Sequence, residues 1–360
     1  YRRYIAKASG GQRPLGISAL EDKIVQRAVI AILNQIYEEA FLGFSYGFRP
    51  GRGQHDALDA LATGILRQPI NWVLDLDVVR CFESFDRVWL ERFLQHRIGD
   101  RRLLRLIRKW LKAGVLEDHV VVEQETGVVQ GAVVSPLLSN IYLHYVLDLW
   151  AHQWRRRHAQ GAVIITRYAD DAVVGFQYRH DAEQFLIALQ ERLATFALHL
   201  HPEKTRLIAF GRYAARDRAR RGQGRPETFT FLGFTHICST SRNGKFQLRR
   251  NTSKKRMRAK LTEIKDTLRR HWHKPIAAQG AWLGRVLRGY YAYHAVPLNG
   301  RRLEAFREQV KWLWLRVLRR RSQRHRMTWR RLERLASRWL PHPRILHPWP
   351  DARFAVTHPR

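Results

Sequence analysis

Hydrophobic residues recur every three or four positions in several long stretches of the chain, and this spacing predicts amphipathic helices. In the first stretch, residues 20–38, Val25, Val29 and Leu33 fall on one face of such a helix. Asp181 and Gln184 have the spacing of a capping box and predict a helix that runs to the breaker His201-Pro202. The same periodicity predicts helices around 58–65, from 88, at 100–113 and 135–149, and from 254 onward, including 303–317.

Shorter apolar runs that are bounded by turn residues predict β-strands. Residues 4–7 and 13–17 flank a Ser9-Gly10-Gly11 turn and predict a basic hairpin. Residues 71–77 predict a strand that ends in carboxylates, and residues 163–176 predict a hairpin with acids at its tip. A further strand is expected at 228–234, loops at 48–53 and 213–227, and an extended tail from residue 341.

The composition is that of a globular protein with a polyanionic partner. Of 360 residues, 45% are hydrophobic and 27% are charged, which allows a sizeable core in two or three domains and excludes disorder over most of the chain. The 65 Lys and Arg exceed the 31 Asp and Glu and give a net charge of +34. No apolar run is long enough to span a membrane, and the basic residues are interleaved with aromatic ones, so nucleic acid is favoured over an anionic membrane surface.

The positive charge is concentrated in the last third of the chain. Residues 251–360 hold 28 Lys and Arg against 6 Asp and Glu, together with 7 of the 12 Trp. This asymmetry predicts a mixed catalytic part followed by a basic segment that grips nucleic acid. The two cysteines, Cys81 and Cys238, do not form a disulfide framework of the kind small secreted proteins use, so a reducing compartment is indicated. The histidines lack the spacing of zinc sites.

Three carboxylates have positions that suggest chemistry. Asp77 ends a predicted strand, and Asp170 and Asp171 lie in the turn of an apolar hairpin. Adjacent aspartates repel each other and need a cation or solvent to remain charged, so a solvated turn is the simpler interpretation of this pair. Two strands, however, can bring three carboxylates together around two Mg²⁺ ions, the arrangement that phosphoryl transfer to a 3′-hydroxyl requires.

The sequence around these acids resembles the reverse transcriptases of group II introns. Arg167-Tyr168-Ala169-Asp170-Asp171 resembles their YADD box, and other boxes of the family occur in the same order along nearly the whole chain. The matching segments are Arg13–Ile17, Asp22–Gln26, Ser45–Arg52, Asp77–Asp86, Gln130-Gly131, Ser135–Asn140, Glu203–Thr205, Phe231–Phe234 and Arg288–Tyr293. The family usually has Phe-Asp where this chain has Phe82-Glu83, an Asp that is supportive rather than metal-binding.

The resemblance implies that Asp77, Asp170 and Asp171 are the catalytic ligands of two Mg²⁺ ions, with Mn²⁺ as an alternative metal. Asp75 competes with Asp77, since both face the same side of the strand. The family places an aromatic residue five positions after the acid, and Phe82 satisfies that spacing only for Asp77. Phe82 is then expected to exclude ribonucleotides by blocking the 2′-hydroxyl, with ordinary core packing as the alternative.

Further binding residues follow from the same resemblance. Gln130 and Gly131 are expected to contact the incoming nucleotide and the template base, unless they merely form a turn. Lys7 and Arg13 would bind the triphosphate, unless they are simply exposed residues of a solvated hairpin. Lys204 would lie near the leaving pyrophosphate, or else at the surface. The residues expected to contact nucleic acid are Arg49, Arg52, Arg319, Arg320 and Arg321.

The implied fold is an α+β right-hand polymerase. Residues 1–250 would form fingers and palm with an antiparallel sheet, 251–325 a basic helical thumb and maturase region, and 326–360 a basic tail rich in Pro and His. The family's N-terminal extension and endonuclease module are not recognisable. The implied partners are an RNA template, a DNA primer, dNTPs and structured intron RNA, with no membrane, in a prokaryotic cytoplasm.

Three functions remain open at this point. The first is RNA-directed DNA synthesis together with intron splicing and retrohoming. The second is an RNA-binding splicing cofactor in which polymerase activity is secondary. The third is a free-standing relative that acts in CRISPR spacer acquisition, phage defence or repair.

Overall fold

The computed structural model describes residues 2–6, 12–113, 115–117, 120–122, 126–128, 130–321 and 327–357. The chain folds as two compact units, Tyr1–Glu227 and Thr228–Arg360. The first unit ends before the predicted palm boundary at residue 250, because the strands after residue 228 pack with the C-terminal helices. The functional division at residues 250 and 325 stays a prediction.

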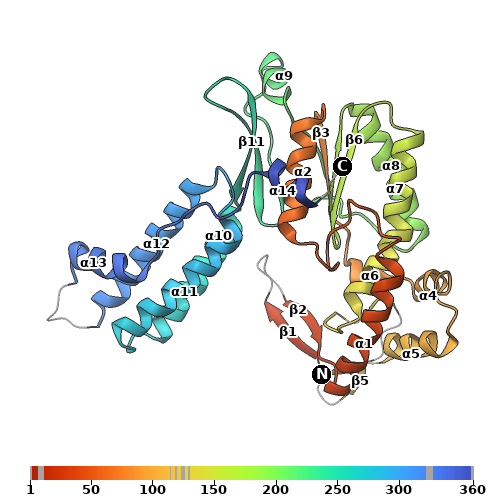
Figure 1. The fold of residues 1–360 in the computed structure, drawn as a ribbon, viewed down its shortest axis with the longest axis horizontal. Helices are drawn as coiled ribbons and strands as arrows, with labels where there is room; N and C mark the ends of the chain where they lie inside the picture. The colour runs from red at the N-terminus through yellow and green to blue at the C-terminus, as the bar shows by residue number, and fades with distance from the viewer. Residues whose placement is uncertain are drawn as a thin grey trace. The chain divides into compact units, whose positions relative to one another are not determined.

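The N-terminal unit combines short antiparallel sheets with helices (Figure 1). Its strands are β1 Arg2–Ala6, β2 Gln12–Gly16, β3 Trp72–Leu76, β4 Val115–Glu117, β5 Val120–Val122, β6 Val163–Tyr168, β7 Asp171–Phe176 and β8 Arg206–Ala209. Its helices are α1 Leu20–Tyr37, α2 Gln54–Arg67, α3 Cys81–Ser84, α4 Arg87–Gln95, α5 Arg101–Lys112, α6 Ser135–Leu143, the π-helix η1 His144–Asp148, α7 Leu149–Arg157, α8 Arg179–Thr195 and α9 Ala214–Arg220.

A four-stranded antiparallel sheet of order β6-β7-β3-β8 forms the centre of this unit. Successive side chains of a strand point to opposite faces, so each face takes its own helices. Ile164 of β6 contacts Gly64 of α2 on one face. The next residue, Ile165, belongs to the main core on the other face, together with Val174 of β7 and Phe185 of α8.

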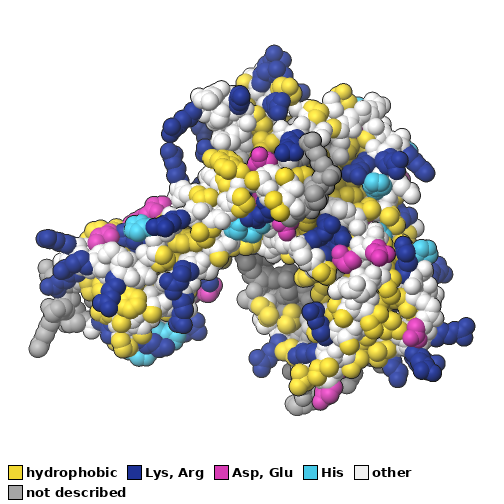
Figure 2. All heavy atoms as spheres, viewed as in Figure 1, with side chains coloured by type: hydrophobic (Ala, Val, Ile, Leu, Met, Phe, Trp, Pro, Cys, Tyr) yellow, Lys and Arg dark blue, Asp and Glu magenta, His cyan; other side chains and the backbone are white. Residues whose placement is uncertain are grey.

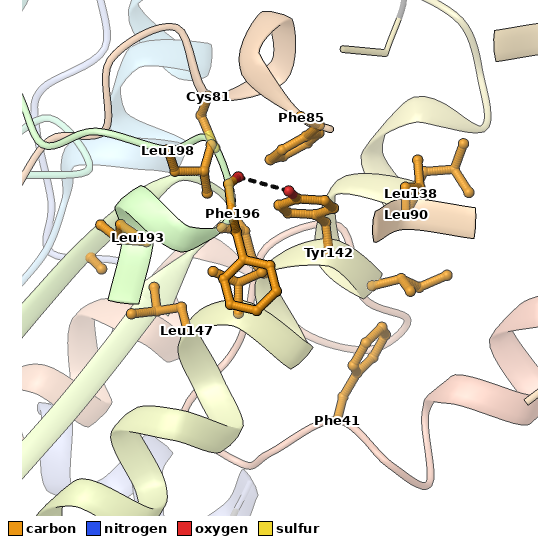
Figure 3. Close-up of a cluster of buried hydrophobic side chains, with 14 of the residues drawn as sticks. Phe41, Cys81, Phe85, Leu90, Leu138, Tyr142, Leu147, Leu193, Phe196 and Leu198 are labelled. Atoms are coloured by element: carbon orange, nitrogen blue, oxygen red, sulfur yellow. Dashed lines mark hydrogen bonds between the residues drawn. The ribbon is translucent and has the colours of Figure 1, made fainter. Parts of the chain in front are cut away.

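The core on that second face is rich in aromatic residues. Tyr142 of α6 packs against Phe85 with the two rings tilted and their centroids 4.4 Å apart, and its hydroxyl donates to the Phe196 carbonyl at 2.8 Å (Figure 3). A buried tyrosine needs such a partner for its hydroxyl, because an unpaired one costs about 1–3 kcal/mol. Leu138 and Leu193 complete the same cluster. This packing fixes α6 and α8 behind the sheet.

The C-terminal unit is a small antiparallel sheet followed by helices. Its strands, in the order β11-β10-β9, are β9 Phe229–Phe231, β10 Phe234–Thr240 and β11 Phe246–Thr252. Its helices are α10 Lys254–Arg270, α11 Ile276–His294, α12 Gly300–Arg319, α13 Trp329–Trp339 and α14 Pro350–Thr357. Trp314 is fully buried between α11 and α12 and donates from its indole to Gln279 at 3.0 Å.

Most predicted elements are present. The strand predicted at 228–234 is interrupted by a turn at Leu232 and Gly233, which separates β9 from β10, and four other elements differ. The predicted helix 135–149 continues to Arg157 through a π-helical segment. Helix α8 begins at Arg179 and ends at Thr195, so the predicted capping box and its stop at residue 201 are wrong. The Asp181 carboxylate instead accepts hydrogen bonds from the backbone of Gln160 and Gly161 at 3.1 and 3.0 Å. That tertiary contact is not visible in local spacing.

The other two differences lie in segments that were predicted to lack helix. Residues 214–220 form α9, since Ala and Arg are strong helix formers that outweigh the flanking Gly. Residues 350–357 of the predicted extended tail form α14, with Pro350 at the first helical position where proline is tolerated. Strand β11 is not predicted from the sequence, because its arginines mask the alternation of buried and exposed side chains. It pairs with β10 over seven residues.

Candidate active site

The end of strand β3 places Asp77 beside the hairpin of β6 and β7. Leu76 of β3 pairs with Ala172 of β7 in antiparallel register, so the next residues along this pair are Asp77 and Asp171. The Asp77 carbonyl accepts from the backbone of His201 at 2.7 Å. The Lys204 ammonium lies 3.4 Å from the Asp77 carboxylate, and both side chains are exposed, by 59% and 39%. Sequence order alone separates these groups by more than ninety residues; the sheet brings them together.

The hairpin tip is a tight, strained turn. Tyr168 of β6 pairs with Asp171 of β7, which leaves only Ala169 and Asp170 in the loop. Ala169 has a φ of 57°, a left-handed conformation that non-glycine residues rarely adopt and that occurs at functional sites. Burial first, and then the negative charge of Asp170, raise the pKa of the Cys81 thiol. Asp170 is therefore electrostatically coupled to the loop that follows Asp77.

Asp75 occupies a different environment from Asp77, although both follow the same face of the strand. The Asp75 side chain is only 22% exposed, and the Arg206 guanidinium lies 3.8 Å from its carboxylate. Burial raises the pKa of Asp75 to about 6; Arg206 lowers it and Asp77 raises it further. Asp75 thus pairs with a cation of β8, whereas Asp77 lies at the open end of the strand.

A buried hydrogen-bond network holds the hairpin tip from behind. Arg167 is fully buried and forms a two-pronged ion pair with Asp148 of the π-helix, with Nε 2.7 Å from Oδ1. The same guanidinium donates to the Ser45 hydroxyl at 2.7 Å and to the Asn140 side-chain oxygen at 3.1 Å. It also donates to the Ala169 carbonyl at 2.8 Å, inside the turn. Breaking one partner of a buried pair of this kind costs about 3–5 kcal/mol.

Gly47 completes this support by direct backbone contact. The Tyr46 amide donates to the Arg167 carbonyl at 2.9 Å, and Asn140 donates to the Gly47 carbonyl at 2.6 Å. A Cβ at position 47 would lie 2.2 Å from the Ala169 nitrogen, so no larger residue fits there. Gly47 and Asn140 lie in segments that match the family, but the sequence did not assign them or Asp148 to the site, since local spacing does not show which residues meet in the fold.

Phe82 follows Asp77 by five residues and lies in the short helix α3. It is half-buried, with its ring centroid 6.2 Å from that of Phe85 at the edge of the main core. Its carbonyl accepts from the Val128 amide at 2.8 Å. Gly127, at a φ of 74°, lies so close that a Cβ there would be 2.6 Å from the Phe82 carbonyl oxygen. Both proposed roles of Phe82, sugar gate and core residue, are compatible with this position.

Gln130 and Gly131 contact the N-terminal hairpin through their backbone. The Gly16 amide donates to the Gln130 carbonyl at 2.7 Å. Gly131 has a φ of 110°, and a Cβ there would lie 2.5 Å from the Gly16 carbonyl oxygen. Arg13 lies in β2 opposite Ile5, but its side chain lies outside the described part, as does all of Lys7. The predicted triphosphate clamp therefore stays a prediction.

Arg49 is corrected from a nucleic-acid contact to a structural residue. Its side chain is 3% exposed and pairs with Glu38, at 2.9 Å from Nη2. Its Nη1 donates to the carbonyls of Leu42 and Ser45, each at 2.8 Å. A guanidinium that is buried among these partners does not face a phosphate. The assignment followed from the resemblance, and local sequence does not show that Glu38 and two carbonyls surround this side chain.

The remaining predicted arginines keep more exposure. Arg52 is half-buried and donates to the Gly43 carbonyl at 2.7 Å. Arg319 and Arg320 are exposed at the end of α12, where Arg319 donates to the Met327 carbonyl at 3.1 Å. Arg321 is partly buried. Their predicted contacts with nucleic acid are compatible with these positions.

The donor chemistry at the hairpin suits a hard divalent cation, since carboxylate oxygens are the ligands that Mg²⁺ prefers. The backbone brings Asp77 next to Asp171, with Asp170 in the loop between β6 and β7. Within the described ranges, however, no three His, Cys, Asp or Glu side chains already converge in a metal-binding group. Asp77 instead lies against Lys204, so rotation of its side chain would be needed to complete a three-carboxylate site.

Comparison with known proteins gives a consistent family match. Residues 5–236 match the profile of the family described as reverse transcriptase (RNA-dependent DNA polymerase). The chain is 42% identical over 153 residues to the group II intron-encoded protein LtrA of Lactococcus lactis, covering 41% of this chain and 25% of that protein. It is 35% identical over 202 residues to protein YkfC of Escherichia coli, covering 48% of this chain and 53% of that protein.

A third relative is an uncharacterised 91 kDa protein in the cob intron of Schizosaccharomyces pombe, 43% identical over 143 residues, 40% of this chain and 18% of that protein. The chain thus spans about a fifth to a half of the length of these relatives. An apo telomerase structure from Candida tropicalis matches 69% of this chain and 54% of its own, with a TM-score of 0.50 and 12% identity. This likeness concerns the fold alone and confirms the predicted α+β right-hand polymerase.

Throughout the described helices, none is both long and apolar enough to cross a bilayer.

Proposed function

Since the chain belongs to the reverse transcriptase family, we propose that it synthesises DNA on an RNA template by adding dNTPs to a primer 3′-hydroxyl. The register of β3 and β7 carries this proposal, because it sets Asp77 next to Asp171 at the tip of a hairpin that Arg167 supports from behind. Phosphoryl transfer depends chiefly on positioning and on neutralising charge, and the neighbouring ends of β3 and β7 would supply the positioning.

Asp77, Asp170 and Asp171 would hold the two Mg²⁺ ions, with Mn²⁺ as an alternative. When bound, such ions activate the 3′-hydroxyl and stabilise the charge on the triphosphate. Lys204, whose ammonium lies 3.4 Å from the Asp77 carboxylate, would give a proton or a hydrogen bond to the departing pyrophosphate. Its salt bridge to Asp77 would be exchanged for these contacts when the site fills.

The residues around the acids have matching proposed roles. Phe82 would exclude the ribose 2′-hydroxyl, and Gln130 with Gly131 would contact the nucleotide and the template base. Lys7 and Arg13 would hold the triphosphate from the hairpin of β1 and β2. The packing of Gly131 against Gly16 supports this set, since it ties the nucleotide-facing loop to that hairpin.

We further propose that the protein binds structured intron RNA and assists splicing and retrohoming in a prokaryotic cytoplasm. This proposal rests on the similarity to a group II intron-encoded protein and on the charge of the last third of the chain. Arg52, Arg319, Arg320 and Arg321 would contact RNA phosphates. A splicing cofactor with secondary polymerase activity, or a free-standing relative, would share the same boxes, and a ribozyme flanking the gene would distinguish the intron role.

Primer extension on an RNA template with Mg²⁺ tests the polymerase. Asp170→Asn should remove most extension while circular dichroism stays unchanged, because a lost metal ligand costs several kcal/mol of transition-state stabilisation. Asp217→Asn is the matched control, since this exposed Asp of α9 pairs with its neighbour Arg216. Extension by Asp170→Asn at the level of Asp217→Asn would refute the catalytic assignment.

A further inference from the structure

A basic groove lies between two helices of the C-terminal unit. It has a volume of about 670 Å³ and is lined by residues of α10, of the turn that follows it, and of α12. We call it the α10–α12 groove and define it by Lys265, Arg269, Trp272, Leu313, Arg316, Val317, Arg319 and Arg320. Its volume is in the range of sites that take ligands the size of a nucleotide, about 300–1,000 Å³.

Helical spacing explains why these residues share a groove. Lys265, Arg269 and Trp272 follow each other at intervals of four and three residues, so they lie along one side of α10 and its terminal turn. Leu313, Val317 and Arg320 repeat at the same intervals on α12. Both helices start at the small sheet, where Asn299 donates to Thr252 at 2.8 Å, so the groove lies at their opposite, C-terminal ends.

The charge of the groove is entirely positive. Five of its eight lining residues are Lys or Arg and none is Asp or Glu. Lys265, Arg269, Arg316 and Arg320 form no ion pair with any residue that the structure describes. Five exposed cations around one concavity whose lining holds no acid create a positive local potential, so the groove is complementary to phosphate. Figure 2 shows Lys and Arg side chains projecting along the helices of this unit.

Trp272 gives the groove a second property that a purely ionic site lacks. Its indole is 48% exposed, which is unusual for the largest apolar side chain, and it lines the groove beside Leu313 and Val317. An exposed aromatic face next to guanidinium groups is a platform on which an unpaired base can stack while its flanking phosphates meet the cations. A fully paired helix hides its base faces and would use only the charges.

We propose that the α10–α12 groove binds an unpaired RNA nucleotide, with its base on Trp272 and its phosphates on Arg269 and Arg316. This deepens the RNA binding set out under the proposed function and assigns it a specific site. An acidic peptide would satisfy the charges but not the indole face, so nucleic acid is the better complement. The unpaired nucleotide can come from a single-stranded template or from a bulge in a structured RNA.

Binding titrations of the full chain with three RNA probes test this proposal. The probes are a single-stranded oligonucleotide, a hairpin with a bulged nucleotide and a fully paired hairpin. Trp272→Ala should weaken binding of the first or second probe by about 5- to 150-fold, the loss that one stacked base represents, and leave the paired hairpin unchanged. The affected probe identifies the source of the nucleotide. Trp272→Phe should restore most of the affinity.

Matched variants separate stacking from charge and from general damage. Trp312→Ala removes a Trp of similar exposure, 52%, that lies outside the groove against Trp329, and should change no affinity. Arg269→Gln should flatten the salt dependence of log affinity by about 0.7–0.9 per lost phosphate contact, whereas Arg258→Gln, exposed on the same helix but outside the groove, should have a smaller effect.

The outcomes distinguish this site from the polymerase proposal. A 2-aminopurine at the unpaired position should lose fluorescence on binding to the wild-type chain but not to Trp272→Ala. If that contrast is seen in a chain that extends no primer, the groove stands and the polymerase proposal fails. The groove proposal is overturned, even when extension is intact, if Trp272→Ala binds every probe with the affinity of Trp312→Ala. It is also overturned if an acidic peptide displaces the RNA equally well from the wild-type chain and from Trp272→Ala.

Discussion

Replacing Gly47 by Ala should disable DNA synthesis without touching any catalytic carboxylate. Gly47 lies against the turn that carries Asp170, and its carbonyl is held by Asn140. A Cβ at position 47 would lie 2.2 Å from the backbone nitrogen of Ala169 and 3.0 Å from its Cα. Because these neighbours are backbone atoms of a strained two-residue loop, no side-chain rotation can relieve the overlap.

The size of the effect follows from that geometry. Gly47 and Ala169 must separate by at least about 0.8 Å to reach the 3.0 Å below which Cβ contacts essentially never occur. A displacement of about 1 Å in a catalytic group costs roughly 10²-fold in rate, and overpacking of this kind costs about 1–3 kcal/mol of stability. We therefore expect a fall of about a hundredfold in kcat with a smaller effect on the affinity for primer and template.

Steady-state primer extension and thermal unfolding, measured on the same preparations, provide the assay. Gly43→Ala is the control, since Gly43 belongs to the same loop region and a methyl group there would have no described atom within 4 Å. It should behave as wild type in both measurements. The reasoning is refuted if Gly47→Ala matches Gly43→Ala in kcat, or if its loss of activity is explained by complete unfolding at the assay temperature.

Three further predictions concern other parts of the chain. Phe82→Val should raise the use of rNTPs relative to dNTPs in a competition assay while dNTP incorporation falls only modestly, because opening a steric block changes discrimination more than chemistry; an unchanged ratio would return Phe82 to the core. The pKa of Asp75 is raised to about 6 in the folded protein, so the folded state binds the extra proton and stability should fall by up to about 3 kcal/mol as the pH rises from about 4 through 6. Asp75→Asn should remove that dependence in denaturant titrations, and a persisting slope would exclude Asp75 as its source. Replacing Arg319, Arg320 and Arg321 together by Gln should weaken binding to structured RNA and flatten the slope of log affinity against log salt concentration by about 0.7–0.9 per phosphate contact. Filter binding at several salt concentrations measures both quantities, and an unchanged affinity and slope would contradict the prediction.

The predictions from sequence succeeded where the signal is local. A helix such as α5 is specified by apolar residues three and four positions apart, and a two-residue hairpin loop by the residues that flank it. The acids at the end of β3 and at the tip of β6 and β7 were visible because strand ends are local features. The excess of Lys and Arg in the last third could be counted directly.

Only the tertiary structure shows which charged side chains are buried and which groups they pair with. Arg49 comes from a predicted loop and Arg167 from a predicted strand, yet both guanidinium groups are buried, because Glu38 and Asp148 neutralise them. A buried charge is tolerated only when its partners are in place; Glu38 and Asp148 lie 11 and 19 residues away in the sequence, and the Ser45 hydroxyl that also binds Arg167 lies 122 residues away. Asp181 accepts hydrogen bonds from another segment for the same reason, rather than capping its own helix.

The register of β3 against β7 was also decided by tertiary packing. Nothing in either segment alone sets Asp77 next to Asp171; the packing of the sheet between α2 on one face and α8 on the other does, because a slip by one residue would exchange the side chains that each helix contacts. The α10–α12 groove likewise needs two helix faces that are some forty residues apart in sequence. The sequence by itself determined which acids lie at strand ends and hairpin tips and which elements hold them, whereas packing of the cores decided which of those residues meet.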